Sequence, residues 1–236
     1  MKIQLKHLFE TVTGIQVFRN SLPRGVDVCR DISRIYAYEL EEIWDIGAHM
    51  GETATYFRSK FAKPTIRSFE PISENFRILQ KRCAEIYDHH SYQLALGNEV
   101  KPMRMYLQEA SVIHSLRSDL NIPSSSNSKI EEINQTTVDS LFNKLNCRKI
   151  DILKIDVEGY EKNVLKGAES CLEQKLINFI YLETGLDTRF NSIQELIDCL
   201  HPVGYMPYAF YEQTPHWTGK QNLWYWNTLF VKEELL

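Results

Sequence analysis

The sequence predicts an α/β protein in which helices cover both faces of a mostly parallel sheet. Segments of strand length that are almost wholly apolar alternate with segments whose apolar residues recur at helical spacing, a pattern typical of strands buried on both faces. A turn with two glycines, Gly47 and Gly51, joins the first such strand to the first such helix. The chain of 236 residues is 43% hydrophobic and 25% charged, which suits one sizeable globular domain.

Charge, hydropathy and cysteine usage exclude several classes of protein. A net charge of −4 provides no basic surface, so nucleic acid is not an expected partner. No apolar run reaches the ~18 residues that a membrane span needs, and the first residues lack the apolar core of a secretory signal. The five cysteines are scattered without a Cys-x-x-Cys pair. They predict neither a zinc site nor a disulfide framework, and they indicate a reducing compartment, most simply the cytoplasm.

The first half of the chain contains a clear order of elements. Residues 1–41 form an accessory segment, which we expect to be helical around 27–41. The strand that begins at Ile43 precedes a helix with Ala54, Phe57 and Phe61 on one face. A second strand over 64–71 contains Glu70 at its end, and a helix capped by Ser73 follows over 72–86.

The second half continues the alternation after a strand at 92–96 and another at 103–107. The polar segment 117–135 predicts a loop, either a lid or a surface excursion. Thr137 caps a short helix, and a strand over 149–156 leads to a single helix from Glu161 to Leu172. A strand over 177–182 ends at Glu183, and Ser192 with Glu195 forms a capping box. The last strands, 205–211 and 227–232, are too close for a crossover helix and should pair antiparallel.

The glycine turn and Glu70 are the first candidates for a ligand site. Glycines at a strand-to-helix turn let backbone N–H groups approach a ligand without interference from Cβ. Glu70 lies 19 positions beyond Gly51, close to the ~20-residue offset at which an acid meets ribose hydroxyls in dinucleotide-binding units. The alternatives are a plain tight turn and a surface glutamate before a proline.

Acidic residues lie at or next to the ends of four predicted strands: Asp45, Glu70, Asp156 and Glu183. Ligands of open parallel sheets bind outside the carboxyl ends of the strands, so these acids should share a pocket. The alternative is that solvated strand ends simply tolerate charge. An acid-rich pocket without a phosphate-binding Lys or Arg suits a cationic ligand. The pocket and the Gly-x-x-x-Gly spacing therefore favour S-adenosylmethionine, which carries a sulfonium, over a dinucleotide.

Four motifs then carry a specific resemblance. They are Asp45-Ile-Gly47-Ala-His49-Met-Gly51, Phe69-Glu70-Pro71, Thr136-Thr137-Val138-Asp139 and Lys154-Ile-Asp156-Val-Glu158-Gly159-Tyr-Glu161. Together they resemble the FkbM family of class I S-adenosylmethionine-dependent methyltransferases, with Val138 where leucine is usual. The resemblance implies a Rossmann-like, doubly wound, mostly parallel seven-stranded sheet with an antiparallel C-terminal hairpin, in a domain over residues 42–236.

The resemblance also implies cofactor contacts. The backbone from Gly47 to Gly51 would line the methionine portion, and Glu70 would hold the ribose hydroxyls. Residues around Leu96 and Ser115 would lie by the adenine. The full set of expected cofactor-binding residues is Asp45, Gly47, Ala48, His49, Gly51, Glu70, Leu96, Ser115 and Asp156.

The chemistry requires a hydroxyl acceptor to lose its proton during attack on the methyl group. Asp156 and Glu158 are the first candidate bases, and His49 is another; the alternative for His49 is that it only orients the glycine turn. A metal is the alternative: Asp156, Glu158 and Glu183 would offer Mg²⁺ hard oxygen ligands, an arrangement that resembles catechol-type O-methyltransferases in topology. Lys154 should share a face with Asp156 and pair with a carboxylate.

Aromatic side chains gather near the C-terminus and suggest the acceptor class: Tyr208, Tyr211, His216, Trp217, Trp224, Tyr225 and Trp226. Such rings suit a carbohydrate or a ring-bearing small molecule, or they pack in the core or in the interface of a homo-oligomer. The sequence therefore predicts an O-methyltransferase acting on a hydroxyl of a carbohydrate or small metabolite. The alternatives are an NAD-dependent oxidoreductase and a non-catalytic cofactor-binding module.

Overall fold

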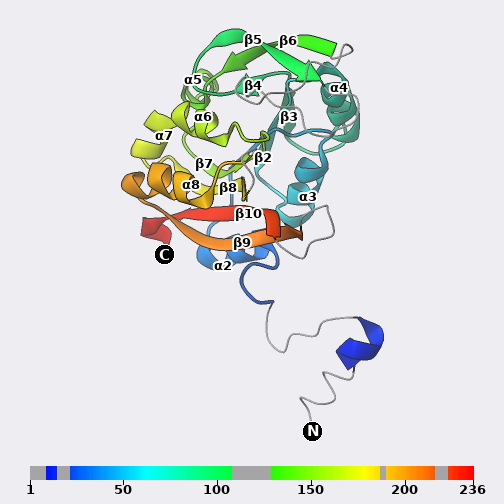
Figure 1. The fold of residues 1–236 in the computed structure, drawn as a ribbon, viewed down its shortest axis with the longest axis vertical. Coiled ribbons are helices and arrows are strands. Elements are labelled where there is room, and N and C mark those ends of the chain that lie inside the picture. Colours follow the sequence, from blue (N-terminus) through cyan, green and yellow to red (C-terminus); the bar gives the residue numbers. More distant parts are fainter. Residues whose placement is uncertain (1–8, 15–21, 108–128, 187–189, 216–222) are drawn as a thin grey trace.

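The computed structural model describes residues 9–14, 22–107, 129–186, 190–215 and 223–236. Its main sheet has seven strands in the order β3-β2-β1-β7-β8-β10-β9 (Figure 1). The first five of these run parallel, and β10 is antiparallel to both of its neighbours, so the predicted sheet and its C-terminal hairpin are confirmed. The strands are β1 Glu42–Ile46, β2 Thr65–Phe69, β3 His89–Tyr92, β7 Ile150–Ile155, β8 Ile177–Gly185, β9 Tyr205–Pro215 and β10 Leu223–Lys232.

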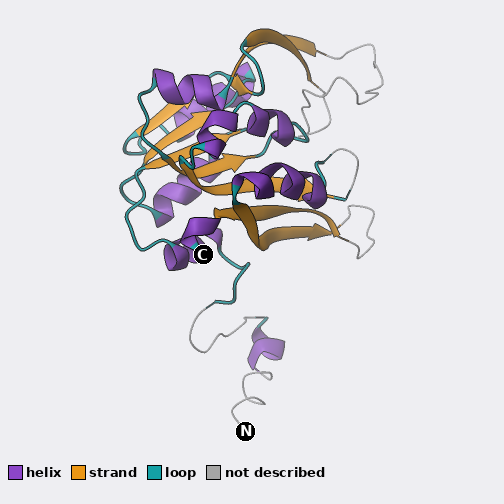
Figure 2. Ribbon diagram, turned by 90° about the vertical axis from the view of Figure 1, so that its left-hand side faces the viewer, coloured by secondary structure: helices purple, strands orange, loops and turns teal. Residues whose placement is uncertain are grey.

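Helices cover both faces of this sheet (Figure 2). One core contains the buried faces of α2 Val28–Ile35, α3 Glu52–Lys60 and α4 Ser73–Arg82. The other contains those of α5 Val138–Lys144, α6 Glu161–Lys166, α7 Glu169–Glu173 and α8 Ile193–Leu200. Successive residues of β1 alternate between the two cores, with Ile43 in the first and Trp44 in the second. The sheet is therefore doubly wound, as predicted.

Strand β7 lies at the centre of the sheet with all six residues buried. Its carboxylate at the amino end, Asp151, accepts hydrogen bonds from the backbone of Glu42 at 3.1 Å and from Asn178 at 2.9 Å. Lys154, near the other end, is the register partner of Asp45 in β1. Both charged residues of the strand are therefore paired, as buried charges need to be.

A second, three-stranded sheet has the order β4-β6-β5. It consists of β4 Ala95–Leu96, β5 Lys101–Leu107 and β6 Lys129–Thr136, and it lies at the opposite end of the molecule from the hairpin (Figure 1). The prediction of a loop through residue 135 was wrong, because 129–135 are strand. Only Ile133 of β6 packs into the small core beside Met105, so the strand has little of the apolar signal that sequence reasoning uses. The alternatives for this loop, a lid or a surface excursion, concern residues 108–128, which lie outside the described ranges.

Three further expectations need correction. The strand over 92–96 is divided between β3 and β4, and the helix expected from Glu161 to Leu172 is two helices. It breaks at Gly167, where a Cβ would lie 1.9 Å from the carbonyl oxygen of Gly97. Ser73 does not cap α4; its backbone N–H donates to Glu131 at 2.9 Å, and Ile72 is the N-cap.

Two capping predictions are confirmed. The Thr137 side chain accepts from the Ser140 backbone, and the Ser192–Glu195 capping box is complete. Helix α2 begins after the N-cap Asp27 and ends at Ile35, shorter than the expected 27–41. None of the helices in the described ranges is long and apolar enough to cross a membrane.

Candidate active site

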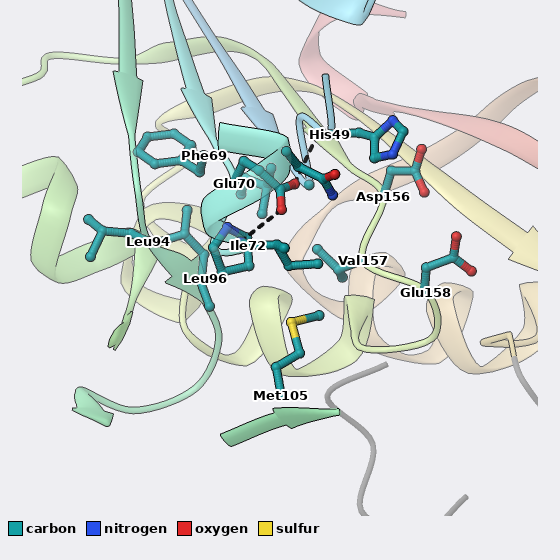
Figure 3. A pocket seen from close by; sticks show the side chains of 15 residues that line it. His49, Phe69, Glu70, Ile72, Leu94, Leu96, Met105, Asp156, Val157 and Glu158 are labelled. Carbon is teal, nitrogen blue, oxygen red and sulfur yellow. Dashed lines mark hydrogen bonds between the residues drawn. The ribbon is translucent and has the colours of Figure 1, made fainter. Parts of the chain in front are cut away.

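A cavity opens at the carboxyl ends of β1, β2 and β7, where the acids of the sequence were expected to meet (Figure 3). It is lined by residues from the main sheet, from α4 and from the small sheet: Ile46, Gly47, His49, Phe69, Glu70, Pro71, Ile72, Asn75, Leu94, Ala95, Leu96, Met105, Asp156, Val157 and Glu158. Glu70 lies apart from Asp156 and Glu158 in this lining, and most of the other side chains that line the cavity are apolar (Figure 3). The single shared cleft that the sequence requires is therefore present.

The glycine turn after β1 packs directly against the turn after β7. Gly47 has a φ of 77°, and a Cβ on it would lie 1.8 Å from the carbonyl oxygen of Asp156. The backbone N–H groups of Gly47 and Ala48 both donate to the carbonyl of Phe69 at 3.0 Å. Gly51, with a φ of 89°, caps α3 where a Cβ would contact the side chains of Cys83 and Leu79. Both glycines are thus required by close approach and by backbone conformation.

Glu70 is buried at one end of the cavity, with 4% of its surface exposed. Its Oε2 accepts the backbone N–H of His49 at 3.0 Å, and its Oε1 accepts that of Ile72 at 2.9 Å. Burial raises the pKa of Glu70 to about 7 against these hydrogen bonds, which lower it. A hydrogen bond from the side chain of Asn75 also lowers this pKa, and the lone pairs that these three donors leave free can accept ligand hydroxyl groups.

A buried ion-pair network lies at the other end. The Nζ of Lys154 is 3.0 Å from Asp156 Oδ2 and 3.4 Å from Asp45 Oδ1. Burial alone would lower the pKa of Lys154, but Asp156 and Asp45 hold it above its usual value. Burial also raises the pKa of Asp45, which is fully enclosed in β1. Asp156, whose side chain is 35% exposed, is the member of this network that reaches the cavity.

Hydrogen bonds to the buried side chain of Glu161 stabilise the turn from Asp156 to Glu161. Glu161 is 1% exposed, and its Oε1 accepts the backbone N–H groups of Val157 at 3.2 Å and Gly159 at 3.1 Å. Its Oε2 accepts from Asn191 at 2.8 Å. Glu158, inside this turn, has a φ of 53°, a left-handed conformation that is uncommon for a non-glycine residue. Surrounding hydrogen bonds therefore hold Glu158 in a backbone state that it would not adopt readily by itself.

Glu183 of β8 joins Asp156 and Glu158 beside the cavity. One ligand atom from each of these residues lies within 4.8 Å of the others. Burial first, and then the charges of Asp156 and Glu158, raise the pKa of Glu183 to about 10. The three acids predicted as a metal set are thus close together in space, although they come from two strands.

His49 occupies the glycine turn with a φ of 48°. Its ring is 40% exposed, lies beside Asp156 in Figure 3, and places Nδ1 3.8 Å from the carboxylate of Glu52. Its backbone N–H, as described above, fixes Glu70. His49 therefore contacts Glu70 through its backbone and places its ring on the side of Asp156 (Figure 3).

Most of the predicted site residues line or support the cavity. Gly47, His49, Glu70, Leu96, Asp156 and Glu158 line it, while Asp45, Ala48 and Gly51 are buried beside the lining residues of the same segment. Ser115 falls outside the described residues. The lining residues that sequence reasoning missed are mainly apolar: Phe69, Ile72, Leu94, Met105 and Val157. Phe69 and Ile72 could have been found as neighbours of Glu70, but Met105 reaches the cavity only because β5 folds over it.

The C-terminal aromatic residues have mixed positions. Tyr211 is 2% exposed and donates to Asp31 at 2.8 Å, and the Trp226 indole donates to Thr228 at 3.0 Å, so both are packing residues. Tyr208 stacks under the guanidinium of Arg24 at 4.0 Å. Trp224 and Tyr225 contact the ring of Phe190. His216 and Trp217 fall outside the described ranges.

Comparison with known proteins identifies the family to which the motifs correspond. Residues 45–207 match the family model described as the methyltransferase FkbM domain. The hexuronic acid methyltransferase AglP of Haloferax volcanii is 28% identical over 170 residues, which cover 68% of this chain and 64% of that protein. Methyltransferase 1 of Beauveria bassiana is 26% identical over 163 residues, covering 61% of this chain and 64% of that one. The chain thus matches less than two thirds of the length of these relatives.

Solved structures support the fold alone. An rRNA methylase from Streptococcus thermophilus superposes with a TM-score of 0.50 at 8% identity, covering 86% of this chain and 93% of that one. At this identity the likeness concerns the arrangement of strands and helices and carries no information on the acceptor.

Proposed function

Because the chain belongs to the FkbM family of S-adenosylmethionine-dependent methyltransferases, we propose that it methylates a hydroxyl oxygen of a carbohydrate or small metabolite. The observation that carries this proposal is one cavity that Glu70, Asp156 and Glu158 line together with mostly apolar side chains. We place the catalytic unit at residues 42–236, with 1–41 as an accessory segment.

The adenosine half of the cofactor fits the Glu70 end. The free lone pairs of Glu70 suit the ribose hydroxyls, because its other lone pairs already hold N–H groups of the protein. Leu96, Ile72 and Met105 provide an apolar surface suited to the adenine ring. Phe69 stiffens this wall through its stack on Tyr92, with ring centroids 5.1 Å apart.

The methionine half fits the glycine turn and the second acidic end. The absence of a Cβ at Gly47 brings the turn against Asp156, and the acids suit a ligand with ammonium and sulfonium charges. When bound, S-adenosylmethionine supplies an electrophilic methyl group, so that methyl transfer depends largely on the position of the acceptor. Asp45, Ala48 and Gly51 support this end from behind, and Lys154 holds Asp156 in place.

The acceptor proton requires a base at the same end. Asp156 and Glu158 line the cavity and are the bases that we propose, with His49 as a third candidate because its ring lies beside Asp156. Glu183, whose pKa is raised to about 10, would hold its proton at neutral pH and is not assigned this role. We keep Mg²⁺ as a candidate second cofactor, because Asp156, Glu158 and Glu183 would offer it hard oxygen ligands.

The acceptor class rests on chemistry and on one relative. The hexuronic acid methyltransferase among the relatives supports a carbohydrate acceptor. The net charge of −4 disfavours nucleic acid. A cytoplasmic location and a homo-oligomeric state both stay predictions.

The decisive experiment combines binding and turnover on the full chain. We expect calorimetry to detect binding of S-adenosylhomocysteine but not of NAD. We also expect a radiolabelled methyl assay to detect transfer to members of a panel of sugars, uronic acids and hydroxylated metabolites. Binding without transfer to any acceptor, including RNA and protein arms, would indicate a non-catalytic module. Transfer to RNA alone would overturn the acceptor class.

A further inference from the structure

The turn between β7 and α6 has an unfavourable backbone conformation. Glu158 and Gly159 both have positive φ, 53° and 90°, and the backbone N–H of Tyr160 donates to the carbonyl of Val157 at 3.2 Å. A tight turn with positive φ at both central residues favours Asn, Asp or Gly at the first of them. Glutamate is unfavourable there, because its Cβ crowds the backbone in the left-handed region. Strained residues of this kind persist where surrounding contacts hold them, and they cluster at active sites.

The position of Glu158 depends on this turn more than that of Asp156 does. Both residues line the cavity (Figure 3). Asp156 directly follows β7, and its backbone N–H donates to the carbonyl of Ile46 in β1 at 2.9 Å, so the main sheet fixes its place. Glu158 is a central residue of the turn itself. The contacts that fix the turn therefore also decide where the Glu158 carboxylate lies.

Asn191 contacts this turn from a distant part of the chain. It lies between β8 and α8 and is 4% exposed. Its Nδ2 donates to the carbonyl of Gly159 at 2.9 Å and to Oε2 of Glu161 at 2.8 Å. Both partners are oxygens, so the amide nitrogen must face them and uses both of its N–H groups. The other oxygen of Glu161 accepts the backbone N–H groups of Val157 and Gly159. Asn191 thus holds the turn directly at a carbonyl and indirectly through a carboxylate.

Neighbouring contacts keep Asn191 itself in place. Its carbonyl accepts the backbone N–H of Gly185, the last residue of β8, at 3.2 Å. Gly185 lies against the ring of Phe190, where a Cβ would approach the ring to 2.5 Å. On its other side Asn191 is followed by Ser192, which begins α8 with a complete capping box. The end of β8 and the start of α8 therefore anchor the amide that contacts the turn.

We propose that Asn191 is a positioning residue for methyl transfer, which holds the turn in the conformation that keeps the Glu158 carboxylate in the cavity wall. This role rests on the proposed function, in which Glu158 acts on the acceptor hydroxyl. Asn191 does not line the cavity, so it acts through the turn alone. Misplacing a reacting group by about 1 Å can lower a rate ~100-fold, so loss of this amide should be measurable in turnover.

Hydrogen exchange tests the turn itself, on the full chain without cofactor or acceptor. Asn191→Ala should raise the amide exchange rates of Val157 and Gly159 at least ~10-fold in NMR spectra, because the carboxylate that accepts them loses its other partner. The matched control is Asn178→Ala. Asn178 is 5% exposed and also donates to a buried carboxylate, that of Asp151 at the opposite end of β7. The control should leave exchange in the turn unchanged. Wild-type exchange rates of Val157 and Gly159 in Asn191→Ala would overturn the proposal.

Turnover separates positioning from a loss of stability. Asn191→Ala should lower kcat ~10-fold or more while its affinity for S-adenosylhomocysteine stays within about threefold, and Asn178→Ala should keep kcat within about twofold of the wild type. In a Glu158→Gln background, Asn191→Ala should change kcat less than about twofold, because both substitutions act on one carboxylate. A loss of kcat from Asn191→Ala that is equally large in both backgrounds would overturn the proposal.

A second variant and the exchange measurement keep this proposal separate from the proposed function. If Asn191→Ala does not fold, Asn191→Ser replaces it, because a serine hydroxyl can donate to only one of the two oxygens that the amide contacts. The same increase in exchange and the same loss of kcat are expected, by a few-fold. Wild-type protein that methylates no acceptor would contradict the proposed function, and the exchange rates of Val157 and Gly159 would still decide whether Asn191 holds the turn.

Discussion

Replacing Glu70 by alanine is expected to weaken S-adenosylhomocysteine binding about 100-fold. Each oxygen of this carboxylate already accepts one backbone N–H, from His49 or Ile72, and can accept a ribose hydroxyl as well. A hydrogen bond to a charged group contributes about 1.5–3 kcal/mol. We take the lower value for both bonds, because the raised pKa of Glu70, about 7, leaves it partly protonated near neutral pH. The sum of about 3 kcal/mol corresponds to roughly two powers of ten in affinity.

Calorimetric titration at pH 7 measures this change. The matched control is Glu74→Ala, an exposed residue in the first turn of α4, which should bind the ligand like the wild type. Thermal unfolding followed by circular dichroism must show that Glu70→Ala is folded, since it leaves two backbone N–H groups facing the cavity. A folded Glu70→Ala protein with affinity within about threefold of the wild type would refute the assignment of the ribose site.

Three further changes test other parts of the site. Gly47→Ala should lower the free energy of unfolding, measured in urea, by at least ~2 kcal/mol more than Gly14→Ala does. Both glycines have positive φ, but only Gly47 has a backbone oxygen at the position that a Cβ would occupy. An equal loss of stability in the two variants would contradict the close approach at Gly47. Asp156→Asn should lower kcat for methyl transfer by ~100-fold or more, while its affinity for S-adenosylhomocysteine changes only a few-fold. An unchanged kcat in steady-state assays would exclude Asp156 as the base. Because folding raises the pKa of Glu183 from 4.5 to about 10, the folded state binds its proton more tightly and stability should fall as pH rises between these values. Glu183→Gln should therefore flatten the fall in unfolding free energy measured from pH 7 to 9, by up to about 1.4 kcal/mol per pH unit, and an identical slope would contradict the shift.

Patterns within short stretches of the chain were sufficient to predict the sheet and most of the acidic site. Buried strands such as β7 carry a mostly apolar pattern, and parallel strands end at one edge of the sheet, so Glu70 and Asp156 could be placed together without coordinates. Capping residues such as Thr137 act within one turn of their own helix, which is why local reasoning found them. These features depend on periodicity within a short segment, or on the rule that parallel strands end at the same edge of a sheet.

The distant segments that complete the site could not be predicted without the three-dimensional structure. The strand β6 has a mostly polar pattern and becomes regular because β5 pairs with it, and that pairing brings Met105 over the cavity. The break between α6 and α7 falls at Gly167, which lies against Gly97 and whose carbonyl accepts the backbone N–H of Asp139. The pairing of β8 with β10 places Glu183 beside Asn227, and each has a buried oxygen without a hydrogen-bond partner in the described part of the chain. These contacts join residues far apart in the chain, where packing and burial outweigh local propensity, so no local pattern in the sequence records them.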